Sequence, residues 1–143
     1  MTRSIDTSGI DGIIGYRLRR AQMAVFARFM KRFAAAGIKP AEYSVLILAA
    51  DNPGLRPSDM AAALGIQRAN FVALAAGLEE RGLIERRAAE ADRRSHAIHL
   101  TPAGAKMVRD IRMIQDKFEA EFVAELGGPA ERDLLLKLLE KLG

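Results

Sequence analysis

Three polar residues at the start of one predicted helix have side chains that can read DNA bases. Gln67, Arg68 and Asn70 follow Gly65 at the beginning of a helix predicted to end near Arg81. Arginine can pair with guanine, and asparagine or glutamine with adenine, because these side chains match the hydrogen-bonding edges of those bases. The alternative is that all three are ordinary polar residues of a solvated helix start, and this helix alone does not decide between the two.

A second group of candidate residues, Asp92-Arg93-Arg94, lies between two predicted strands. An aspartate beside two arginines can hold one guanidinium bidentately and leave the other available. An available arginine on a thin hairpin suits a narrow minor groove, where the negative potential of DNA is highest. The ordinary alternative for such residues is a solvated, charged turn.

The predicted elements around these residues follow the order of a winged helix-turn-helix. Apolar residues at helical spacing predict a long first helix over about residues 10–36, which Gly37 ends. Five further helices are predicted at 40–50, 57–64, 68–81, 102–126 and 129–142, and all of them except 68–81 begin with a proline. Strands at 83–87 and 96–100 would form a hairpin with residues 88–95 at its tip. The predicted fold class is therefore mainly α with a two-stranded β wing, and the fourth helix is expected to enter the major groove.

The stretch from Leu55 to Gly104 resembles the MarR family of bacterial regulators. The matching segments are 64–66, 78–86, Asp92-Arg93-Arg94 and 100–104. The resemblance implies that Arg93 enters the minor groove and that Arg94 forms the wing salt bridge with Asp92. It departs from the family at Ala73, where many members have an arginine, so base recognition would depend on Arg68 and Asn70. The full set of expected DNA-binding residues is Ser58, Gln67, Arg68, Asn70, Arg86, Arg93 and Arg94.

The last predicted helix has too many leucines for one buried stripe. Leu134 to Leu139 cover most of its circumference, and a helix that is apolar all round is buried all round. In a chain of 143 residues a second subunit is a more suitable cover than the monomer core. The family resemblance agrees, since it implies dimerisation through the first, fifth and sixth helices. We expect a homodimer of one domain, 1–143, with dimerisation helices at 10–36 and 102–143 and a DNA-binding region at 40–101. The expected interface residues are Leu135, Leu138, Leu139 and Leu142.

The first helix is unusually basic for a segment outside the DNA-binding region. Its cations are Arg17, Arg19, Arg20, Arg28, Lys31 and Arg32, with Asp11 as the nearby acid. Guanidinium groups bind phosphates bidentately, and adjacent apolar residues can hold a ring. Segments 15–22 and 68–72 also resemble the branch of the family that senses hydroxycinnamoyl-CoA thioesters. The expected effector is an aromatic carboxylate or its coenzyme A thioester. The alternative is a solvated face or a surface for the DNA backbone. The expected ligand-binding residues are Arg19, Met23, Phe26 and Tyr43.

Composition narrows the remaining functions. The net charge is +4, with an excess of basic residues before position 110 and of acidic residues after it, which suits a polyanion partner. There is no cysteine, and His96 and His99 should face opposite sides of a strand, so neither a metal nor a cofactor is expected. The sequence has no nucleophile–base pair and no glycine-rich phosphate loop, so we do not expect an enzyme. A DNA-binding module without an effector remains an alternative. No apolar run approaches the roughly 20 residues of a membrane span, and no signal-peptide core is present, so we expect a cytoplasmic protein without membrane contact.

Overall fold

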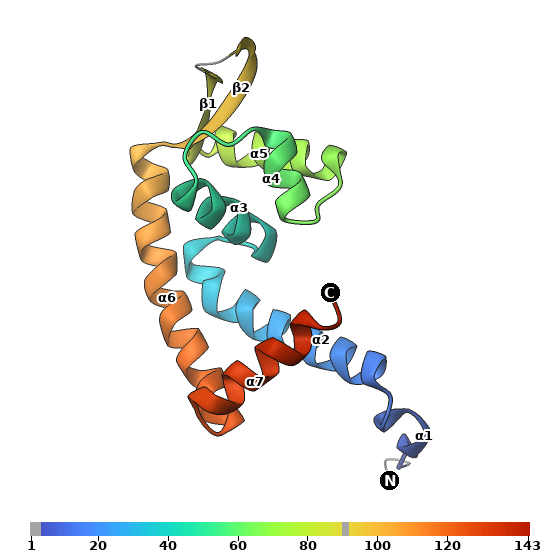
Figure 1. The fold of residues 1–143 in the computed structure, drawn as a ribbon. Coiled ribbons are helices and arrows are strands. Elements are labelled where there is room, and N and C mark those ends of the chain that lie inside the picture. Colours follow the sequence, from blue (N-terminus) through green and yellow to red (C-terminus); the bar gives the residue numbers. More distant parts are fainter. Residues whose placement is uncertain (1–3, 90–91) are drawn as a thin grey trace.

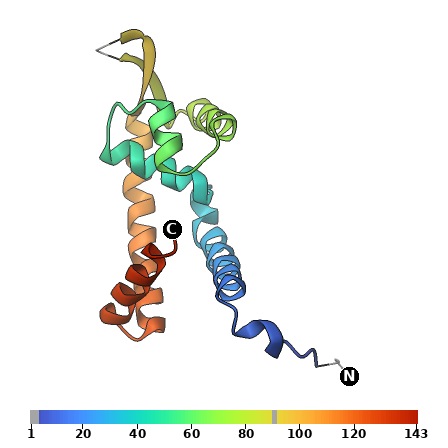
Figure 2. The same ribbon diagram turned by 45° about the vertical axis from the view of Figure 1, so that its right-hand side comes forward.

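The computed structural model describes residues 4–89 and 92–143, and the side chains of Asp92 and Arg93 lie outside this description. Two long helices, α2 (Ile14–Phe33) and α6 (Pro102–Leu126), extend away from a small head (Figure 1). The head contains α3 (Pro40–Asp51), α4 (Pro57–Ala63), α5 (Arg68–Glu80) and a two-stranded sheet. Helix α7 (Pro129–Glu140) folds back from the far end of α6, between the diverging ends of the two long helices (Figure 2).

The first predicted helix is interrupted near its start. Helix α1 (Ser8–Asp11) ends at Gly12, and Ile13 has an extended backbone with φ −89° and ψ 123° before α2 begins. Glycine has a low helix propensity because it loses the most backbone freedom on folding, which explains the break at this position. The far end agrees with the prediction, since a short 3₁₀ turn, η1 (Ala34–Ala36), ends at Gly37 in the left-handed conformation. Helix α1 therefore projects away from the rest of the chain (Figures 1 and 2).

The head has the predicted helix-turn-helix followed by a wing. Helices α4 and α5 are joined through Gly65, which has φ 63°, a conformation that glycine adopts without a steric penalty. Strands β1 (Ile84–Ala89) and β2 (Asp92–Leu100) pair antiparallel and are longer than predicted. One further link was not predicted: Leu55 forms an isolated bridge with Ile98. This bridge ties the segment before α4 to the wing.

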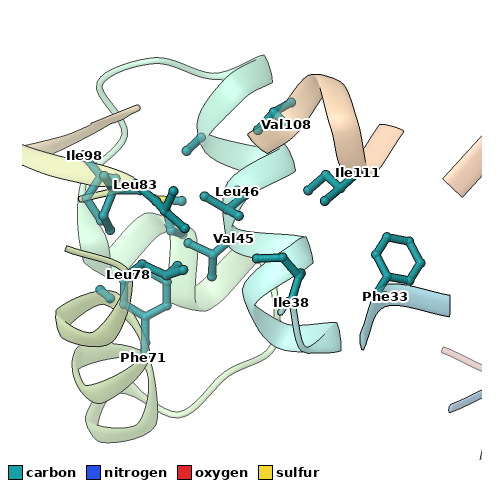
Figure 3. Packing of buried hydrophobic residues seen from close by; sticks show 14 of the residues in the cluster. Phe33, Ile38, Val45, Leu46, Phe71, Leu78, Leu83, Ile98, Val108 and Ile111 are labelled. Atoms are coloured by element: carbon teal, nitrogen blue, oxygen red, sulfur yellow. The ribbon is translucent and has the colours of Figure 1, made fainter. Parts of the chain in front are cut away.

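The hydrophobic core fills the head and continues into the junction with the long helices. Val45 and Leu46 of α3 lie at its centre, between the wing and α5 on one side and α6 on the other (Figure 3). Phe71 and Leu78 anchor the inner face of α5, each 1% exposed. The aromatic rings of Phe29, Phe33, Tyr43 and Phe118 continue the core between α2, α3 and α6.

The start of α6 is fixed to the wing by a close backbone contact. Thr101 is the N-cap, as predicted, because its hydroxyl accepts a hydrogen bond from the Gly104 backbone N–H at 3.0 Å. The same hydroxyl donates to the Gly82 carbonyl at 2.5 Å. A Cβ atom at position 104 would lie 1.9 Å from the carbonyl oxygen of Leu83, so this position requires glycine. The head and α6 are therefore joined tightly. Nothing in the structure explains Gly77 within α5, because a Cβ there would meet open space.

None of the helices in the described ranges could cross a membrane alone by length and composition. Only two strongly bent helix pairs, α2 with α3 and α4 with α5, pass that test when taken together.

Candidate DNA-binding surface and ligand cavity

A concave surface lies between the start of α4, the start of α5 and the wing, and it encloses a volume of about 380 Å³. Three predicted DNA-binding residues, Ser58, Arg68 and Arg86, lie on it although they come from three different segments. Arg56 and His96, which the sequence analysis did not assign to DNA binding, also line it. Arg56 directly precedes Pro57, and a cation beside a predicted helix start was the available signal. The head therefore gathers basic side chains at the end expected to face DNA.

Gln67 and Asn70 lie just outside this concave surface on the same helix. Gln67 is the N-cap residue of α5, and its side chain makes no capping hydrogen bond. Both residues are exposed, whereas Phe71 next to them is buried in the core. The burial of Phe71, Ala75 and Leu78 fixes the rotation of α5 so that its polar start faces solvent.

The wing carries its charges in two different ways. Arg86 forms an ion pair with Glu79 of α5 at 3.2 Å, which ties the wing to the recognition helix. Arg87 instead pairs along its own strand with Glu85. Arg94 is exposed on β2. The predicted Asp92–Arg94 salt bridge and the minor-groove role of Arg93 depend on side chains outside the described residues, so both stay predictions.

The pairing of the two strands shifts near the tip of the wing. Ala88 lies opposite His96, but the next residue, Ala89, lies opposite Asp92. Three residues of β2 therefore lie between two consecutive pairs, and they include Arg93 and Arg94. Bulges of this kind bend a strand and re-aim its side chains, which suits a wing tip that approaches a groove.

A second cavity, of about 660 Å³, lies between α2, α3, α6 and α7. Two of the predicted ligand-binding residues, Phe26 and Tyr43, line it, together with Phe29, Phe118 and Phe122. The other two, Arg19 and Met23, are exposed on α2 and are not part of its lining. Burial raises the pKa of the Tyr43 phenol, so this hydroxyl stays protonated at neutral pH. The cavity is thus an aromatic-lined space with a neutral hydroxyl in its wall.

The polar wall of this cavity could not be found from the sequence. Glu119 and Arg132 line it and form an ion pair at 3.0 Å. Glu125 also lines it, and accepts two hydrogen bonds from Arg28 at 2.7 and 2.9 Å. The guanidinium of Arg28 lies 4.2 Å from the centre of the Phe122 ring, within cation–π range.

These pairs correct one inference from the sequence. The sequence indicates only Asp11 as an acid near the cations of the first helix, but two of these cations have counter-ions on α6. Arg28 pairs with Glu121 and Glu125, and Arg32 pairs with Glu121. Four cations of α2 make no ion pair within the described part of the chain: Arg17, Arg19, Arg20 and Lys31. The basic surface available to an anion is therefore smaller than the sequence indicated.

Large apolar side chains remain exposed on the helices furthest from the head. The leucines of α7 and Leu142, which follows the end of this helix, have side chains that are 38–62% exposed. This group includes all four predicted dimer residues. Ile14 and Leu18 of α2 are 67% and 39% exposed. Several large apolar side chains exposed along one helix are typical of a protein interface. The single chain thus leaves uncovered the surface that the sequence assigned to a partner subunit.

A helix-turn-helix with an exposed polar start to its second helix, followed by a two-stranded wing, defines a winged helix-turn-helix DNA-binding protein. Comparison with known proteins agrees with this class. Residues 36–95 match a sequence model described as the MarR family. A Thauera aromatica protein named "Putative transcriptional regulatory protein for hcr operon" is 36% identical over 132 residues, which are 92% of this chain and 79% of that protein. The chain belongs to the MarR family of transcriptional regulators.

Two solved structures of a repressor, CouR, are similar over almost the whole chain. CouR bound to a 23-mer DNA duplex has a TM-score of 0.91 and 36% identity, covering 98% of this chain and 99% of that one. CouR bound to p-coumaroyl-CoA has a TM-score of 0.88 and 33% identity, covering 97% of both chains. These similarities confirm the predicted fold class, mainly helical with a two-stranded wing.

Proposed function

We propose that this chain is a homodimeric repressor, released from a pseudo-palindromic operator by a small aromatic effector or its coenzyme A thioester. The observation that carries the proposal is the placement of two separate sites. Basic residues from the N-cap of α4, from α5 and from β1 converge at one end, and an aromatic cavity lies between α3 and the helices that leave the head. In this proposal residues 40–101 bind DNA, and residues 10–36 and 102–143 form the dimer.

The DNA-binding part of the proposal assigns different roles to different residues. Arg68 and Asn70 contact bases in the major groove, with Gln67 beside them. Ser58 and Arg86 contact the phosphate backbone, which positions the head without selecting sequence. Two heads related by a two-fold axis would bind half-sites about 10 base pairs apart. CouR, 36% identical and with a TM-score of 0.91, has been solved on DNA and supports this assignment.

The effector part of the proposal depends on the cavity and on the basic surface of α2. A volume of about 660 Å³ is in the usual range of roughly 300–1,000 Å³ for small-molecule sites. Phe26 and Tyr43 would contact the aromatic ring. The unpaired cations of α2, Arg19 among them, would bind the phosphates of coenzyme A. Met23 would contact the same ligand outside the cavity. CouR bound to p-coumaroyl-CoA supports a thioester as the effector.

Catalysis is not part of the proposal, because the similar proteins are transcriptional regulators. The proposal also requires no metal. Within the described ranges, no cluster of three or more histidine or acidic side chains could hold one. A cytoplasmic location is part of the proposal, because a DNA-binding regulator must reach the DNA.

The direct test is an electrophoretic mobility shift with the DNA that flanks this protein's own gene. We expect a retarded complex that p-coumaroyl-CoA dissociates and that free p-coumarate and free coenzyme A leave intact or affect less. Affinity should fall steeply with salt, because phosphate contacts release counterions. A complex that forms and that none of the three compounds dissociates would support DNA binding and contradict the proposed effectors. Absence of any specific complex would contradict an operator in that DNA.

A further inference from the structure

The recognition helix, α5, carries hydrogen-bonding side chains only near its two ends. The polar residues of its start lie within 67–70. The next polar side chain along the helix is that of Glu79, whose carboxylate pairs with Arg86 of the wing at 3.2 Å. From 71 to 78, a stretch that the structure describes in full, every residue is apolar or glycine. The side chains in the middle of α5 can therefore contact base edges only through carbon atoms.

Val72 is the largest exposed side chain in this apolar stretch. It is 50% exposed, whereas Phe71 and Leu78 are each 1% exposed. Figure 3 shows Phe71 and Leu78 pointing from α5 into the core, and this rotation of the helix leaves Val72 on the solvent side. The other exposed residues of the stretch, at positions 73, 76 and 77, are two alanines and a glycine. The isopropyl group of Val72 is therefore accessible to a partner.

The position of Val72 places it on the surface proposed to face DNA. Val72 lines the concave surface between α4, α5 and the wing, together with Arg68 and Arg86. Arg68 precedes it by four residues, so the two side chains lie on the same side of α5. A single exposed valine elsewhere on a protein would need no explanation. This valine, however, lies beside an arginine proposed to contact a base, so its apolar side chain would also meet base edges.

The four bases present different groups to an apolar side chain in the major groove. Thymine presents a C5-methyl group, which valine can cover with a gain from apolar burial. Adenine and guanine present nitrogen and oxygen atoms, which lose hydrogen bonds to water when an apolar side chain covers them. Cytosine lacks the methyl group and presents an amino donor. A contact with valine therefore favours thymine over the other three bases.

We propose that Val72 selects thymine, through a contact between its side chain and the C5-methyl group of one thymine in each half-site of the operator. The inference rests on the proposed function, since it requires that α5 enters the major groove of an operator with two half-sites. It adds a specificity-determining residue to Arg68 and Asn70. It also specifies a base that neither of these polar side chains accounts for.

Uracil differs from thymine only by the absence of this methyl group, so uracil-containing DNA tests the contact directly. The unmodified chain first selects its half-site from a library of randomised duplexes, and each enriched thymine is then replaced by deoxyuridine. Fluorescence anisotropy compares the affinities. We expect one thymine per half-site at which uracil weakens binding about threefold to fivefold, the effect of burying one methyl group. Replacement in both half-sites should weaken binding about tenfold to twentyfold.

The variant Val72→Ala separates this contact from other effects of uracil. It should bind the thymine-containing operator at least about tenfold more weakly than the unmodified chain, because both subunits lose the apolar contact. It should also bind the thymine and uracil duplexes within about twofold of each other. Asn70→Ala is the matched control, since it truncates an exposed polar residue of the same helix. This control should lower the affinity for the operator but keep the full preference for thymine over uracil.

The outcomes distinguish this inference from the proposed function. If no sequence is enriched from the library, specific DNA recognition by α5 is contradicted, and the role of Val72 with it. Enriched half-sites that lack thymine, or that accept uracil at every position without loss, would keep the regulator and overturn the contact. A folded Val72→Ala protein that retains the full preference for thymine would also overturn it. If that variant does not fold, the comparison of thymine and uracil duplexes on the unmodified chain still decides.

Discussion

The head and the long helices differ in how completely one chain covers its own apolar residues. In the head, Phe71, Leu78 and Ile84 are each 1% exposed, and Ile98 is fully buried. At the far end, Leu134 and Leu142 are 58% and 62% exposed. The head buries its apolar core within one chain, whereas α7 and the start of α2 present apolar surface that a second copy would cover. Stability of the head should therefore be a property of the chain, and stability of the far end a property of the dimer.

The same two regions differ in their use of charge. Arg56 and Arg68 line an open surface of the head and form no ion pair in the described ranges, so they are available for phosphates or bases. On the long helices, Arg28 and Arg32 are paired with acids of α6. The fold itself therefore partly neutralises two cations of α2, whereas Arg56 and Arg68 keep their charge available to a partner.

The largest expected effect is a loss of stability when the buried core of the head is truncated. Phe71→Ala should destabilise the protein by about 3–5 kcal/mol, because it leaves a cavity under the recognition helix. Chemical denaturation followed by circular dichroism measures this loss. Val72→Ala is the matched control on the same helix, since Val72 is 50% exposed and its truncation should change stability little. Similar losses in both variants would show that the α5 anchor is not where the structure places it.

The next effect concerns the exposed leucines of α7 at the far end of the molecule. Leu138→Lys should convert a dimer to a monomer, because a charge would be buried in the proposed interface. Analytical ultracentrifugation measures the change in mass. Affinity for a two-half-site operator should fall by about one hundredfold or more, since the two heads no longer bind as one unit. A variant that stays dimeric would place the interface elsewhere, and a monomer with unchanged operator affinity would contradict binding as a dimer.

Within the head, two arginines should behave differently on DNA. Arg68→Ala should cost about 1–3 kcal/mol on the operator and relax base preference at particular positions. Arg93→Ala should weaken operator and random DNA alike, because an arginine in the minor groove responds to shape more than to sequence. Fluorescence anisotropy on both DNAs measures the two losses. If both variants lose affinity equally on both DNAs, the division between base contact and groove contact is wrong.

The parts of the fold that could be predicted from sequence are those that local chemistry fixes. Pro57 and Pro102 start helices, and Gly37, Gly65 and Gly127 end or join them in the left-handed conformation, as the sequence indicated. The break at Gly12 was missed because the apolar spacing continues across it. The requirement for Gly104 was also hidden, since it comes from a contact with Leu83 that only the assembled fold creates.

The candidate sites divide in the same way. Ser58, Arg68 and Arg86 were found because helix starts and strands near a helix-turn-helix have known directions. The polar wall of the cavity was not found, because its pairs join distant positions. Arg28 and Glu125 are 97 residues apart in sequence, yet their side chains form two hydrogen bonds. Such a pair becomes visible only when the crossing of α2 and α6 is known.

The smallest expected effect tests whether this distant pair matters for stability. The Arg28 guanidinium holds the pKa of Glu125 below its ordinary value of 4.5, so the pair stabilises the folded state above that value and is lost as the pH falls through the lower folded pKa. Glu125→Gln should therefore lower the Tm slightly at pH 7, and the difference from the unmodified chain should shrink in acid. The effect should be small, because the Glu125 side chain is 59% exposed and water screens its charge. Asp110→Asn, which breaks an exposed pair within α6 alone, provides the control in the same melting experiment. A large loss of Tm at pH 7 that persists in acid would show that Glu125 supports the far end by packing. The long helices would then depend less on the partner subunit than their exposed leucines indicate.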